Sequence, residues 1–129
     1  MCGTAGRQPA ILVADDEVMI LDLVTNLMQS EGYLPLPASD GHAALELSRS
    51  YKGTIDLMIT DLEMPRLNGT DLCSHLLAER PGIKVLVMTG EDIGRLRRDA
   101  ASLPVLPKPF DCLVLTARVR ALLAMGGTP

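Results

Sequence analysis

Short apolar runs alternate with amphipathic segments along almost the whole of this 129-residue chain. The apolar runs have the length of buried strands, and the amphipathic segments repeat their apolar side chains every three or four positions, as helices do. Strands that alternate with helices in this way predict an α/β fold, in which helices cover a parallel sheet. The expected strands are 10–14, 33–38, 57–60, 84–88 and 105–106, and the expected helices are 17–31, one that opens at 39–41, 69–79, 92–101 and 113–123.

The prolines predict the order of these strands. Proline cannot donate a hydrogen bond to a sheet, so it belongs in edge strands or at strand ends. Pro35 and Pro37 lie in the second strand, and Pro104 and Pro107 flank the fifth, whereas the other three strands contain none. The second and fifth strands are therefore expected at the two edges, as in the doubly wound five-stranded order 2-1-3-4-5.

Length and composition limit the number of domains, the partners and the cellular compartment that we expect. The chain is long enough for one domain, expected at 10–125, with a loose leader at 1–9 and a tail at 126–129. The net charge of -4 argues against a nucleic-acid partner. The sequence contains no apolar run long enough for a membrane span. The three cysteines are far apart, which favours reduced thiols and a cytoplasmic location.

Acidic residues gather where two neighbouring strands of the predicted sheet end. Asp15, Asp16 and Glu17 follow the first strand, and Asp61 and Glu63 follow the third. Ligands of such sheets bind beyond the carboxyl ends of the strands, where the winding direction reverses. The crowded carboxylates predict a divalent cation with oxygen ligands, Mg²⁺, with Asp16 and Asp61 as direct ligands and Asp15 as a ligand through water.

Two further residues at the same edge suit a phosphate group. Thr89 follows the fourth strand and offers a hydroxyl donor, and Lys108 follows the fifth and offers a positive charge. Each feature also has a purely structural interpretation. The acids 15–17 could complement the dipole of the helix that they open, Thr89 could be a helix N-cap, and Lys108 could be a surface lysine.

Four motifs in order, ILVADDE, ITDLEMPRLNG, VMTG and LPKPF, resemble the response-regulator receiver domain of bacterial two-component signalling. The resemblance covers about 9–125 and implies a flavodoxin-like sheet. It implies that Asp61 accepts a phosphoryl group from the phosphohistidine of a histidine kinase, with Asp15, Asp16 and the carbonyl of Glu63 serving Mg²⁺. Thr89 and Lys108 would contact the phosphoryl group, and the Lys108–Pro109 peptide bond would be cis.

The sequence departs from the family at two places. Val105 stands where many members carry an aromatic residue, so a rotamer switch there is expected to be absent or muted. Fewer positions than is usual separate Thr89 from Lys108, which predicts a shortened or irregular fourth helix at 92–101. Gly69 matches the family's loop after the acceptor, and we interpret it as a residue free to take a positive φ.

The expected function is a phosphoryl-accepting signalling switch that catalyses only its own phosphorylation and dephosphorylation. Its expected partners are a histidine kinase, which could be the same polypeptide if this is a receiver excised from a hybrid kinase, and an unidentified downstream protein. Asn26 and Gln29 of the first helix would face the kinase, and Glu63 and Glu91 would tune hydrolysis of the phosphoryl group. Two alternatives are a Mg²⁺-dependent phosphohydrolase and an interaction module that works without phosphorylation.

Overall fold

The structure is a computed structural model that describes residues 8–64, 67–90 and 104–125. The helix expected at 92–101, most of the expected leader and the expected tail at 126–129 lie outside the described residues. The elements are β1 (Ala10–Ala14), α1 (Val18–Ser30), β2 (Leu34–Ala38), α2 (Gly41–Ser50), β3 (Leu57–Asp61), α3 (Gly69–Glu79), β4 (Lys84–Thr89), β5 (Val105–Pro107) and α5 (Cys112–Met125). Each agrees with an expected segment to within a few residues.

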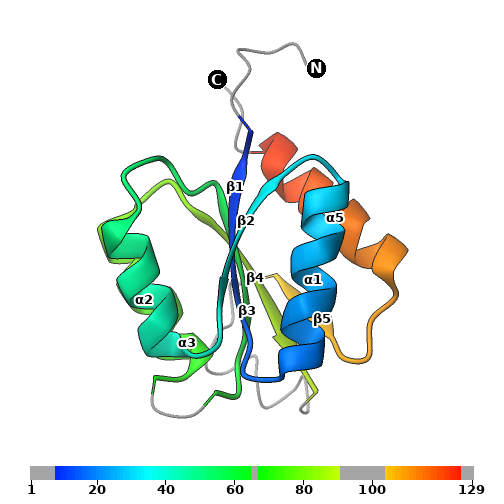
Figure 1. Ribbon diagram of the computed structural model, residues 1–129, viewed down its shortest axis with the longest axis horizontal. Helices are drawn as coiled ribbons and strands as arrows, with labels where there is room; N and C mark the ends of the chain where they lie inside the picture. Colours follow the sequence, from blue (N-terminus) through cyan, green and yellow to red (C-terminus); the bar gives the residue numbers. More distant parts are fainter. Residues whose placement is uncertain (1–7, 65–66, 91–103, 126–129) are drawn as a thin grey trace.

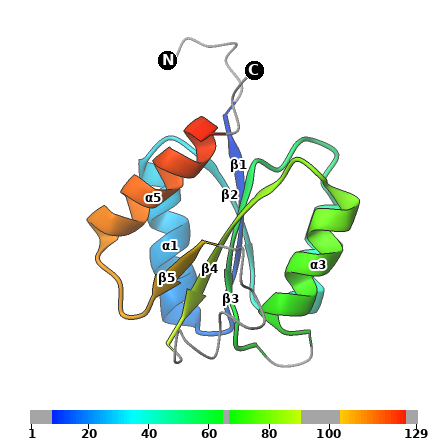
Figure 2. The same ribbon diagram turned by 180° about the vertical axis from the view of Figure 1, so that it is seen from behind.

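The five strands form one parallel sheet in the order β2-β1-β3-β4-β5, which confirms the predicted topology. Helices α1 and α5 cover one face of the sheet, and α2 and α3 cover the other (Figure 1), as the view from behind also shows (Figure 2). The carboxyl ends of all five strands therefore meet at one edge, the lower edge in Figure 1.

The two prolines of β2 are tolerated because of the direction in which their nitrogens point. In the ladder between β2 and β1, the Leu34 N–H donates to the carbonyl of Pro9 over 2.9 Å, and the Asp15 N–H donates to the carbonyl of Ala38 over 3.2 Å. Backbone groups alternate along a strand, so the nitrogens of Pro35 and Pro37 point away from β1, toward the open edge. Proline therefore costs this strand no hydrogen bond to β1.

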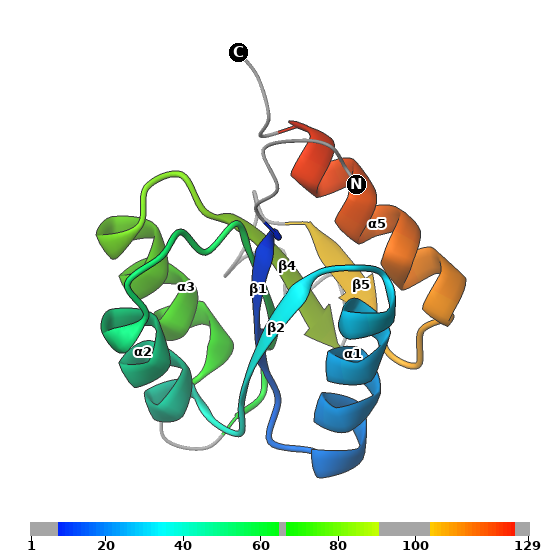
Figure 3. The same ribbon diagram turned by 45° about the horizontal axis from the view of Figure 1, so that its top comes forward.

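Side-chain alternation along the strands divides the core into two layers. In β1, Ile11 and Val13 pack toward α1 and α5, whereas Leu12 and Ala14 pack toward α2 and α3. All five residues of β1 are buried, as befits a central strand covered on both faces. Figure 3 shows the two helical layers with the sheet between them. This packing holds β1, β3 and β4 firmly in place, and the loops that carry the polar residues begin where these strands end.

Side chains cap three of the helices, and at the start of α5 (Cys112–Met125) the side chain of Asp111 accepts a hydrogen bond from the Leu113 N–H over 2.7 Å. The side chain of Asp40 accepts a hydrogen bond from the Ala43 N–H at the start of α2, and that of Asn68 does the same for the Asp71 N–H at the start of α3. Helix α1 differs, because its N-cap residue, Glu17, makes no side-chain cap. That glutamate lies beside the acidic residues at the end of β1, where its side chain has another partner.

Candidate functional site

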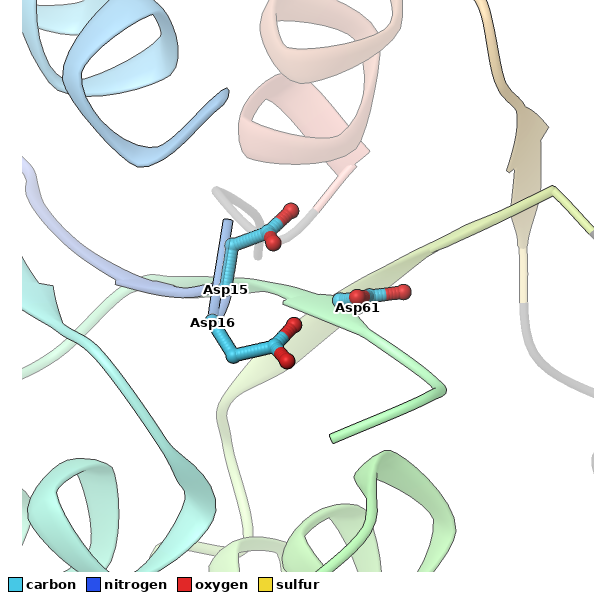
Figure 4. A group of neighbouring side chains, drawn as sticks. All are labelled: Asp15, Asp16 and Asp61. Atoms are coloured by element: carbon cyan, nitrogen blue, oxygen red, sulfur yellow. The ribbon is translucent and has the colours of Figure 1, made fainter. Parts of the chain in front are cut away.

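The structure brings together the three aspartates that the sequence predicts at the edge of the sheet. Asp15 and Asp16 directly follow β1, and Asp61 is the last residue of the neighbouring strand β3. One carboxylate oxygen from each lies within 4.8 Å of those of the other two. Figure 4 shows the three side chains projecting in the same direction from the ends of the two strands. Such a set of hard oxygen donors fits a single divalent cation of the magnesium type.

Burial differs sharply among the three carboxylates. Asp15 and Asp61 are buried, whereas Asp16 is exposed. Burial raises the pKa of Asp61 above its usual range, and the negative charge of Asp15 raises it further, although the Glu63 N–H and Lys108 act in the opposite direction. Ionisation of Asp61 is therefore unfavourable in the folded protein, and a cation or a positive side chain nearby would stabilise the ionised form.

Lys108, which follows the edge strand β5, brings a positive charge to the three carboxylates. Its Nζ lies 3.0 Å from Oδ2 of Asp15, 3.0 Å from Oε1 of Glu17 and 3.5 Å from Oδ2 of Asp61. Burial acts to lower the pKa of Lys108, but hydrogen bonds to Asp15 and Glu17 outweigh burial and raise it to about 12. The peptide bond between Lys108 and Pro109 is cis, as the resemblance implied.

Both oxygens of the Asp15 carboxylate are engaged within the protein. Oδ1 accepts from the backbone N–H of Glu17 over 2.8 Å, and Oδ2 accepts from Nζ of Lys108. At Asp61, the Glu63 N–H donates to Oδ1 over 3.2 Å, a longer distance than either hydrogen bond to Asp15.

Thr89 is the last residue of β4, the strand that pairs with β3. It is fully buried at the end of β4, one position beyond Met88, the partner of Asp61 in the strand register. Its carbonyl accepts from the Lys108 N–H over 2.7 Å, which ties the end of β4 to the residue that follows β5. The hydrogen bonds between β4 and β5 therefore position both Thr89 and Lys108.

Gly69 does not use its freedom to take a positive φ, so this freedom is not the reason for a glycine here. Gly69 is the first residue of α3 and does not take that conformation; among the described glycines only Gly32, after α1, does. The position instead lacks space. A Cβ there would contact the Asp61 carbonyl oxygen and would lie 2.7 Å from Cα of Leu62. The small residue lets α3 begin directly against the strand end that carries Asp61.

Several other predicted positions lie outside this pocket. Val105 is half-buried on the edge strand beside Val87. Asn26 and Gln29 are exposed on α1. Glu91 lies outside the described residues. Within the part of the chain that is described, no helix has the length and apolar character needed to cross a lipid bilayer.

The contact between Glu17 and Lys108 is the feature of the site that sequence reasoning missed. Glu17 was expected only among the acids that follow the first strand, with no partner of its own. A signal was present, because glutamate is a poor N-cap residue compared with serine, threonine, aspartate or asparagine. A glutamate at that position therefore indicates a side chain with a task other than capping.

Comparison with known proteins agrees with this geometry. Residues 11–120 match the family described as response regulator receiver domain. Response regulator MprA of Mycolicibacterium vanbaalenii is 36% identical over 116 residues, which are 88% of this chain and 49% of that protein, so the chain spans about half the length of the curated relatives it matches.

Solved structures give the same result. A response regulator receiver domain protein from Clostridium thermocellum has a TM-score of 0.81 and 28% identity, covering 91% of this chain and 95% of that one. Response regulator TrrA from Thermotoga maritima, solved in complex with Mg(2+)-BeF, has a TM-score of 0.79 and 29% identity, covering 89% and 99%. The chain belongs to the response regulator receiver domain family of two-component signalling.

Proposed function

We propose that Asp61 accepts a phosphoryl group from the phosphohistidine of a histidine kinase, and that the modified protein presents a changed docking surface to a downstream partner. The observation that carries this proposal is the position of the Asp61 carboxylate, which clusters with those of Asp15 and Asp16 and lies 3.5 Å from Nζ of Lys108. A carboxylate so placed can attack an anionic phosphoryl group, because positive charge is available on the side that the phosphoryl oxygens would occupy.

The transfer exchanges a phosphorus–nitrogen bond in the donor for a phosphorus–oxygen bond to Asp61. An oxygen of the Asp61 carboxylate forms a bond to phosphorus while the bond from phosphorus to the imidazole nitrogen of the donor breaks. The electron pair of that bond stays on the ring nitrogen, and because the other ring nitrogen of the donor carries a proton, neutral imidazole leaves. The product is an acyl phosphate on Asp61, and Lys108 and the hydroxyl of Thr89 would donate hydrogen bonds to its oxygens.

The donor set also supports a magnesium site. Asp16 and Asp61 would bind Mg²⁺ directly, Asp15 would bind through water because its oxygens are already engaged, and the carbonyl of Glu63 would complete the protein ligands. The bound ion would neutralise charge on the phosphoryl oxygens. The solved structure of TrrA with Mg(2+)-BeF supports this choice of metal.

The reaction would be confined to the protein itself. The chain would catalyse its own phosphorylation and dephosphorylation and act on no separate substrate. Glu63, whose side chain is exposed two positions after Asp61, would tune hydrolysis by orienting or excluding water. An unchanged lifetime of the acyl phosphate in a Glu63→Ala variant would contradict that role.

The partners follow from the same proposal. Asn26 and Gln29, exposed on α1, would contribute to the face that meets the kinase, in the cytoplasm. The net charge of the chain is -4, so these residues themselves are proposed to contact no nucleic acid. The relative TcrX of Mycobacterium tuberculosis, named a probable transcriptional regulatory protein, is about twice as long. The chain could equally be a receiver of a hybrid kinase, with the kinase in the same polypeptide.

A small phosphodonor tests the proposal directly. The protein is incubated with acetyl phosphate and Mg²⁺, and intact-mass spectrometry should show a gain of one phosphoryl group. Asp61→Asn should abolish the gain, whereas Asp71→Asn, which removes an exposed carboxylate from α3, should retain it. An unlabelled wild-type protein, or equal labelling of Asp61→Asn, would overturn the proposal. The first of these results would favour an interaction module that works without phosphorylation.

A further inference from the structure

Glu17 lies at the N-cap of α1, but its side chain contacts a distant part of the chain instead of capping the helix. It occupies the N-cap of α1 with extended backbone angles, φ -84° and ψ 110°, yet its side chain accepts no hydrogen bond from its own helix. Its Oε1 instead accepts from Nζ of Lys108 over 3.0 Å, from a residue 91 positions away. A residue that fails its local role while making such a contact marks a functional position.

The contact draws the Lys108 ammonium away from the phosphoryl acceptor. Nζ is within hydrogen-bond distance of Asp15 and Glu17, at 3.0 Å each, whereas Oδ2 of Asp61 lies at 3.5 Å, beyond the usual range for an N–H donor. The ammonium is therefore directed toward the loop between β1 and α1 rather than toward Asp61.

The two partners of Lys108 are not equally replaceable. The Asp15 side chain is 0% exposed, so losing the lysine would leave a buried charge without compensation. The Glu17 side chain is 62% exposed and can return to water at little cost. Lys108 can therefore lose its hydrogen bond to Glu17 at a lower cost in free energy than its hydrogen bond to Asp15.

We propose that Glu17 is a positioning residue that holds Lys108 toward the β1–α1 loop until Asp61 is phosphorylated, when oxygens of the phosphoryl group replace the Glu17 carboxylate as the partner of the lysine. This inference rests on the proposed function of Asp61. A phosphoryl group brings a charge of about -2 and three acceptor oxygens, so it competes well against one exposed carboxylate. Glu17 thus stabilises the unphosphorylated form and slows its phosphorylation.

The first test needs no phosphodonor. NMR of the lysine side-chain ammonium groups, assigned with a Lys108→Arg variant, should show a Lys108 signal protected by its hydrogen bonds in the wild-type protein. Glu17→Gln should shift or broaden that signal. Asp22→Asn, which removes an exposed charge from the same helix, should leave it unchanged. An identical Lys108 signal in wild type and Glu17→Gln would overturn the proposed contact.

The second test measures the rate constant for phosphorylation by acetyl phosphate in Mg²⁺. Glu17→Gln should raise it by about two- to fivefold, the range expected for the loss of an exposed ion pair, and Asp22→Asn should not. Glu17→Asp keeps the charge but is one methylene shorter, so it should also raise the rate constant. An effect of charge alone would leave Glu17→Asp like the wild type, which would overturn the proposal.

A double-mutant cycle separates release of Lys108 from simple repulsion of the anionic donor. In a Lys108→Ala background, Glu17→Gln should bring no further gain, because there is no lysine to release. A gain of the same size in that background would overturn the proposal. Failure of the wild-type protein to be labelled would overturn the proposed function and the exchange together, whereas labelling at Asp61 with no rate change in Glu17→Gln would overturn the exchange alone.

Discussion

Asp15 and Lys108 form a hydrogen-bonded ion pair of 3.0 Å, although 93 positions separate them along the chain. The pair links the end of the central strand β1 to the residue that follows the edge strand β5. It spans the carboxyl edge of the sheet, because β3 and β4 lie between those two strands, and Nζ of Lys108 lies 3.5 Å from Oδ2 of Asp61. The arrangement of the pocket therefore depends on this one interaction as well as on the strands.

Removal of the cation from this pair should destabilise the fold. Lys108→Met leaves the fully buried Asp15 carboxylate uncompensated and beside Asp61. We expect the free energy of unfolding in metal-free buffer to fall by about 2 to 3 kcal/mol. Chemical denaturation measures it, with Lys52→Met, at an exposed lysine, as the control. Equal losses in the two variants would show that the pair contributes nothing specific.

Magnesium should stabilise the folded protein, since the three aspartates meet only in the folded state. At a concentration ten times the dissociation constant, the gain should be about 1.4 kcal/mol, seen as a rise in the thermal midpoint. Asp16→Asn should remove most of that rise, because Asp16 is exposed and free to take a direct ligand role. Asp71→Asn should retain it. A rise of wild-type size in Asp16→Asn would exclude Asp16 as a ligand.

The pH dependence of the free energy of unfolding should reveal that ionisation of Asp61 is unfavourable in the folded protein. Burial and the charge of Asp15 raise its pKa in the folded state above the value of 3.8 expected when unfolded. The folded form then binds this proton more tightly, so stability from this group is present at low pH and is lost as the pH rises through the folded pKa.

Asp61→Asn cannot lose that proton. In metal-free buffer, the free energy of unfolding of the variant minus that of the wild type should therefore increase from acidic pH toward neutrality. Denaturation at a series of pH values measures this difference. A difference that stays flat, or that falls, would show that Asp61 ionises without a penalty in the fold.

The close approach at Gly69 predicts a steric cost for any larger residue. In Gly69→Ala, the new Cβ would contact the Asp61 carbonyl oxygen and Cα of Leu62, both of them backbone atoms that cannot easily move. We expect a loss of about 1 to 3 kcal/mol in the free energy of unfolding. Gly82→Ala is the matched control, because nothing lies within 4 Å of a Cβ there. Similar stabilities for both variants would contradict this account of Gly69.

Arg80 should be needed to hold the end of α2. Its guanidinium donates to the carbonyls of Ser48, Tyr51 and Gly53 at 2.7 to 2.9 Å, and to the Ser48 hydroxyl at 2.9 Å. A lysine cannot serve four acceptors from one point, so Arg80→Lys should lower the free energy of unfolding by about 2 kcal/mol. Arg49→Lys, at an exposed ion pair, should change it little. Equal thermal midpoints for Arg80→Lys and Arg49→Lys would contradict this role of Arg80.

Much of the site could be predicted from the sequence because it depends on strand ends. Period and length identify the strands, and Pro35 and Pro37 place their strand at an edge. A parallel sheet then brings the residues that follow its strands to one edge, so Asp15, Asp61 and Lys108 had to lie near one another. No knowledge of side-chain conformation is needed for that conclusion.

Only the tertiary structure decided which of these neighbours bind one another. Asp16 is adjacent to Asp15 in the chain, yet Asp15 is buried against Lys108 and Asp16 is exposed. Glu17 contacts Lys108 instead of capping its helix. Gly69 is required by the space beside Asp61 rather than by its own backbone angles. Such choices depend on the packing of atoms from segments far apart in the chain, whereas periodicity and turn chemistry report only on near neighbours.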